Sequence, residues 1–74
     1  MERRIKFSRT EDVQDFVNAA SRCDFDIDIF YNRVVIDAKS MLGVLSMDLS
    51  KIMTVKWDGE DQSLEKVISR LAVI

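Results

Sequence analysis

The 74-residue chain has no histidine and no proline, one cysteine and two glycines. The lack of histidine excludes Ser-His and Cys-His catalytic pairs, and one cysteine excludes an intramolecular disulfide and fits a reducing compartment. No apolar run approaches the roughly 18 residues of a membrane span. The formal net charge of −2 gives no bulk attraction to nucleic acid or to anionic membranes. We therefore expect a cytoplasmic protein that binds neither nucleic acid nor membrane.

Enzyme signatures are also lacking. The chain has no glycine-rich phosphate loop with its lysine and no cysteine or histidine spacing for zinc. Asp24, Asp26 and Asp28 alternate as they would on the solvated face of a strand. Cys23 has no basic neighbour in sequence to activate it, so we expect it to be packed. The sequence therefore predicts no catalytic residue, no metal and no cofactor.

The apolar residues that are present define a first strand and a first helix. Residues 3–7 favour a strand with Ile5 and Phe7 on one side. The helix begins either with a capping box formed by Ser8 and Glu11 or with Thr10 as its N-cap. Its apolar stripe has helical spacing, and it ends near Arg22. The members of this stripe are Val13, Phe16, Val17 and Ala20.

Further elements follow from the same periodicities. Alternating residues 25–31 predict a strand, Asn32 and Arg33 a two-residue turn, and residues 34–38 a second strand that completes a hairpin. A short helix runs from about residue 40 to Met47, and a strand carries Met53, Val55 and Trp57. Residues 58–61 break this strand, and helical spacing resumes in a last set, Leu64, Val67, Ile68 and Leu71.

The predicted order is β-α-β-β-α-β-α in a single domain, residues 1–74. Each helix has one apolar stripe, which it can bury by lying on one face of a four-stranded antiparallel sheet. The sequence therefore predicts an α+β fold.

Residues 39–46, Lys-Ser-Met-Leu-Gly-Val-Leu-Ser, carry a family resemblance. They resemble the Lys-Ser-(Ile/Met)-(Met/Leu)-Gly-(Val/Leu)-(Met/Leu)-Ser signature of HPr, the phosphocarrier of the bacterial sugar phosphotransferase system, and of its regulatory paralogue Crh. The match extends back through Asn32 to Phe16 and Val17, and forward to residues 59–61. The resemblance implies an open-faced β-sandwich with the strand order first, fourth, second, third.

The resemblance fails where this family carries its histidine. Counting back from Phe16, the histidine position falls on Arg9, the arginine position on Glu11 and the proline position on Asp12. A guanidinium only donates hydrogen bonds and cannot accept a phosphoryl group, and Glu11 would repel a phosphate. We therefore expect an HPr-like protein without phosphohistidine carrier activity.

Ser40 matches the serine that a dedicated kinase phosphorylates in HPr and Crh. The resemblance implies a regulatory phosphoserine at Ser40, with Met41, Leu42 and Leu45 contacting protein partners, namely an HPr kinase and a transcription regulator. The alternative for these residues is that Ser40 only caps a helix and the apolar side chains pack inward. A second hypothesis is a non-phosphorylated structural or interaction module that forms a homodimer, motivated by a short, edge-like first strand.

Overall fold

The computed structural model describes residues 1–73. Seven elements follow one another in the predicted order, four strands and three helices. They are β1 (Glu2–Ile5), α1 (Thr10–Ser21), β2 (Ile27–Tyr31), β3 (Val34–Asp37), α2 (Met41–Leu45), β4 (Met53–Trp57) and α3 (Gln62–Leu71).

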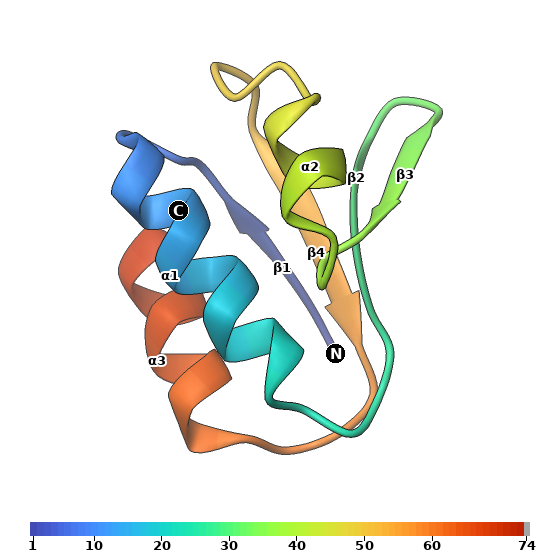
Figure 1. Cartoon of the computed structure of the whole chain (residues 1–74), viewed down its shortest axis with the longest axis vertical. Coiled ribbons are helices and arrows are strands. Elements are labelled where there is room, and N and C mark those ends of the chain that lie inside the picture. Colours follow the sequence, from blue (N-terminus) through green and yellow to red (C-terminus); the bar gives the residue numbers. More distant parts are fainter. Residues whose placement is uncertain (74) are drawn as a thin grey trace.

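The four strands form one antiparallel sheet in the order β1-β4-β2-β3. Helices α1 and α3 lie side by side over one face of this sheet, and α2 lies over the same face nearer to β2 and β3 (Figure 1). The expected α+β fold and the strand order implied by the resemblance are both confirmed.

The hydrophobic core fills the space between the sheet and the helices. Phe16 of α1 is fully buried, and its ring meets the ring of Phe7 edge to face at a centroid distance of 5.7 Å. The core-facing side chains of the strands recur at every second position, as a half-buried sheet requires. Those that are fully buried are Ile5, Ile27, Ile29, Met53 and Val55.

The hairpin between β2 and β3 turns at Asn32 and Arg33. Asn32 has a φ of 52°, in the left-handed region that asparagine tolerates better than most residues. Tyr31 pairs with Val34 directly beside the turn. The predicted hairpin is therefore confirmed.

The first helix begins differently from either sequence-based prediction. Arg9 is the N-cap residue, with extended backbone, and the carboxylate that serves the helix start belongs to Asp12 instead of Glu11. The side chain of Asp12 accepts from the backbone N–H of both Ser8 and Arg9. Neither Ser8 nor Thr10 acts as the cap, because Asp12 reaches back to the entering chain.

Several element boundaries also differ from the predicted ones: β2 begins at Ile27 instead of residue 25, and β3 ends at Asp37 instead of residue 38. β1 ends at Ile5, although Phe7 is still buried beyond it, and α2 ends at Leu45 instead of Met47. Met47 is buried just after the helix, so its side chain joins the core without belonging to a regular element.

The two edges of the sheet are unequal. Ile5 forms a bridge with Ala72, Lys6 donates to the carbonyl of Leu71, and Val73 donates to the carbonyl of Arg4, so residues 71–73 cover the C-terminal end of the outer edge of β1. The strand that motivated the homodimer hypothesis therefore has a partly covered edge. Among residues 1–73, no strand pairs with the outer side of β3. Within the same residues, no helix is both long and apolar enough to cross a bilayer.

Candidate functional site

Ser40 is the N-cap of α2. Its hydroxyl oxygen accepts from the backbone N–H of Gly43 at 3.2 Å, and its backbone is extended, as a cap residue requires. The residue is exposed, so the hydroxyl lies at the protein surface. The neighbouring Lys39 turns its ammonium group to the carbonyl of Cys23 at 2.9 Å. Ser40 therefore combines a capping role with an accessible oxygen.

The apolar residues of α2 separate into two groups. Leu42 is 83% exposed and Leu45 41% exposed, whereas Val44 is fully buried. Met41 is partly buried and packs against the core. Of the three predicted partner-binding residues, Leu42 and Leu45 thus present apolar surface beside Ser40, and Met41 contributes mainly to packing.

Gly43 permits this arrangement. A Cβ at this position would lie 2.8 Å from Cγ2 of Ile36 and 3.0 Å from the hydroxyl of Ser40. Because neither neighbour could stay in place, only glycine allows α2 to approach β3 this closely while its N–H bonds to Ser40. The central glycine of the segment is therefore a packing requirement.

The start of α1 is the second candidate region, since the resemblance assigns the family's histidine position to Arg9. The carboxylate of Asp12 reaches back to the backbone N–H groups of the two residues that lead into the helix. One oxygen accepts from Ser8 N–H at 3.0 Å and from Arg9 N–H at 3.2 Å. The other accepts from Arg70 at 2.9 Å, and Arg70 also binds Asp15 at 3.0 Å.

Asp12 is nearly fully buried and stays ionised in this setting. The Ser8 N–H, followed by the Arg70 guanidinium, holds the pKa of its carboxyl below the usual value against the opposing effect of burial. A carboxylate already held in this position would repel a phosphate brought to the same N–H groups. The chain thus supplies its own anion at the helix start.

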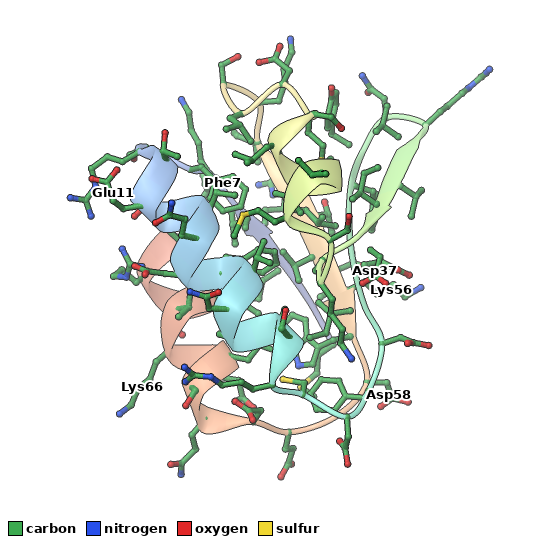
Figure 2. The ribbon with its side chains drawn as sticks, viewed as in Figure 1. Phe7, Glu11, Asp37, Lys56, Asp58 and Lys66 are labelled. Atoms are coloured by element: carbon green, nitrogen blue, oxygen red, sulfur yellow. The ribbon has the colours of Figure 1, made fainter. Side chains whose placement is uncertain are left out.

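The surroundings of Arg9 offer no replacement for the missing histidine. A surface hollow beside the helix start is lined by Phe7, Ser8, Arg9, Thr10, Leu49 and Ser50. These side chains include hydroxyls and a guanidinium but no nucleophilic nitrogen. Glu11 projects from the start of α1 and away from the sheet (Figure 2). The side chains around the predicted histidine position therefore include no imidazole.

Cys23 and the acidic residues add no further chemistry. Cys23 is buried, its Sγ donates to the carbonyl of Ala19, and burial raises the pKa of its thiol, which opposes reactivity. Within residues 1–73, no group of three or more cysteine, aspartate or glutamate side chains is arranged to hold a metal ion.

Comparison with known proteins identifies the family. The family model described as the PTS HPr component phosphorylation site matches residues 12–73. The chain belongs to the HPr family. A solved structure of the phosphocarrier protein HPr from Bacillus anthracis str. Ames is similar, with a TM-score of 0.74 and 24% identity over 96% of this chain and 95% of that one. A comparison with curated protein sequences finds no match.

The matched range covers some of the predicted site residues and not others. It starts at Asp12 and leaves out Arg9 and Glu11, the positions assigned to the family's histidine and arginine. It includes Ser40 and all of α2.

Sequence reasoning missed the role of Asp12. The available signal was an acidic residue three positions after Arg9, a spacing that fits the carboxylate of a capping box. Arg70 could not be anticipated, because it lies 58 residues from Asp12 and reaches it only through the packing of α3 on α1.

Proposed function

We propose that this HPr-family protein is a regulatory protein-binding module, controlled by phosphorylation of Ser40, that carries no phosphate on a histidine. It is not an enzyme. Its partners are other proteins, an HPr kinase and a transcription regulator, and it acts in the cytoplasm. The observation that carries the proposal is the exposed Ser40 hydroxyl with the exposed side chains of Leu42 and Leu45 on the same helix.

The chemistry of the modification is compatible with this geometry. A kinase would transfer the γ-phosphoryl group of ATP to the Ser40 oxygen, which loses its proton, and ADP would leave. The Gly43 N–H that now bonds to this oxygen could then donate to the phosphate. The two leucines would lie beside a new dianionic group, and such a mixed apolar and anionic surface suits recognition by a protein that presents arginine.

The loss of carrier function rests on separate residues. The chain contains no histidine, and the Asp12 carboxylate, which Ser8 and Arg9 N–H hold beside the start of α1, would repel a phosphate there. Transfer from phosphoenolpyruvate by the general phosphotransferase enzyme should therefore leave no acid-labile phosphate on this protein. Such a phosphate would contradict the proposed absence of carrier activity.

The test is incubation with an HPr kinase and ATP, followed by intact mass measurement. Wild type should gain one phosphate. The informative variant is Ser40→Asn, because asparagine keeps the N-cap interaction but offers no hydroxyl to phosphorylate. Ser46→Ala is the matched control, since Ser46 is an exposed serine at the other end of α2.

We expect Ser40→Asn to remain unmodified and Ser46→Ala to be modified like wild type. An unmodified wild type, or equal modification of Ser40→Asn, would contradict the proposal. A binding assay with the phosphorylated protein then tests the surface. Leu42→Ser should weaken partner binding and leave the unfolding midpoint nearly unchanged, because the Leu42 side chain is 83% exposed.

A further inference from the structure

The outer edge of β3 offers unpaired backbone groups. Ala38 donates to the carbonyl of Ile27, and β3 continues this antiparallel register with Ile36 opposite Ile29 and Val34 opposite Tyr31. Because hydrogen-bonded pairs alternate in such a ladder, Val34 and Ile36 turn their backbone groups toward β2. Val35 and the N–H of Asp37 therefore face outward, where a further strand could bind.

This edge is apolar at its centre. Val35 is 60% exposed and Val34 40% exposed, although both belong to a regular strand. Exposed β-branched residues on an uncovered edge favour pairing with another strand, and proteins usually cover or charge such edges. Residues 71–73 cover the C-terminal end of β1 at the opposite edge of the sheet, whereas no strand among residues 1–73 covers β3.

Charges on the open face of the sheet indicate what the added strand should carry. Asp37 lies directly opposite Asp28 in a pair that brings side chains close together, and like charges opposite one another are unfavourable. Asp28 has Lys56 on its other side, in β4. Asp37 has no ion pair among residues 1–73. Figure 2 shows Asp37 and Lys56 on the side of the molecule that bears β3, away from α1 and α3.

We propose that the outer edge of β3 pairs antiparallel with β3 of a second copy of this chain about a two-fold axis at Val35. The axis follows from the sequence Arg33-Val34-Val35-Ile36-Asp37, which has opposite charges at equal distances from its centre. Centring on Val35 places Arg33 of each copy opposite Asp37 of the other. It thereby gives each Asp37 the cation that its own sheet lacks.

The same register also pairs the outward-facing backbone N–H and C=O groups of the two copies. The two Val35 residues would exchange N–H and C=O, which both face outward, and each Asp37 N–H would donate to the Arg33 carbonyl of the other copy. The Asp37 carbonyl already accepts from Ser40 N–H and takes no part. A register shifted by one residue would place the backbone groups of Val34 and Ile36, which already face β2, at the new interface, and Arg33 would no longer lie opposite Asp37. The result is a continuous eight-stranded sheet, and its formation does not depend on phosphorylation of Ser40.

The test is sedimentation of the full chain from low micromolar to millimolar concentration at low salt. Wild type should pass from monomer to dimer. Arg33→Asp and Asp37→Arg each replace two attractions by two repulsions, so each should raise the dimer dissociation constant about tenfold or more. An equimolar mixture of the two variants restores both opposite-charge pairs and should dimerise like wild type. Lys66→Asp, a similar charge change on exposed α3, should dimerise like wild type.

A backbone variant gives an independent result. Val35→Pro removes an N–H that faces away from β2, so the monomer should keep its circular dichroism spectrum and lose the dimer. A wild-type chain that stays monomeric at millimolar concentration would overturn the proposal. A dimer that survives both charge reversals would do the same, because it would use another surface. Failure of the mixture to recover dimers would also exclude this register.

Discussion

Replacement of Asp12 by alanine should be among the most destabilising changes to a charged residue in this protein. It removes the acceptor of two backbone N–H groups and of Arg70. Each partly buried backbone bond to a carboxylate contributes about 1 kcal/mol or somewhat more. The Arg70 side chain is 45% exposed, so solvent screens its pairing, and we assign it less than about 1 kcal/mol. The expected loss is about 3 kcal/mol, a large part of a total stability of roughly 5 kcal/mol.

The assay is urea unfolding followed by the fluorescence of Trp57, which is buried and is the only tryptophan. Asp12→Asn keeps an oxygen for the two N–H groups and should cost only about 1 kcal/mol. Asp15→Ala is the control, because Asp15 is half exposed and pairs only with the same Arg70. It should lose less than about 1 kcal/mol. If Asp12→Ala were no more destabilising than Asp15→Ala, our account of the helix start would be wrong.

Three further predictions concern acid stability and packing. The pKa of Asp12 is lower in the folded than in the unfolded state, so its contribution to stability is fully present above the unfolded value of about 3.9 and is lost as pH falls through the folded pKa. Asp12→Asn should therefore lose less unfolding free energy than wild type between about pH 5 and 2, as measured by urea unfolding at each pH. Phe16→Ala should cost about 3–5 kcal/mol, because the side chain is fully buried against Phe7, and an almost unchanged melting temperature would contradict its core position. Gly59→Ala should cost about 1–3 kcal/mol, since the new Cβ would clash with the ring of Phe25. A Gly59→Ala, Phe25→Leu double variant that is no less stable than Phe25→Leu alone would confirm the clash as the cause.

Local periodicity made most of the elements predictable. Helical spacing around Phe16 and alternation along residues 25–31 each depend on neighbours within a few residues, and the structure has α1 at the first and β2 over Ile27–Tyr31 at the second. The turn at Asn32 was predictable for the same reason, because the left-handed backbone is a local preference. Strand order is different: periodicity does not encode it, and the prediction came from the family resemblance.

The start of α1 shows where local reasoning failed. Ser8 and Glu11 fit a capping box by their spacing, yet Asp12 makes the contacts because its other oxygen binds Arg70 across the molecule. The same limit applies to α2. The spacing of apolar residues in α2 could not show that Met41 packs against the core while Leu42 is exposed. The orientation of this five-residue helix depends on how closely Gly43 lets it approach Ile36.

The sequence by itself determined what chemistry is excluded, because a chain without histidine cannot form a phosphohistidine in any fold. It also determined the order of helices and strands, since hydrophobic spacing is a local property. Only the tertiary structure decided that the Asp12 carboxylate serves the helix start and that, within residues 1–73, the edge of β3 is unpaired while the end of β1 is covered. These features depend on contacts between residues far apart in the chain, and such contacts are fixed by the packing of α3 and the C-terminal residues against the rest of the molecule.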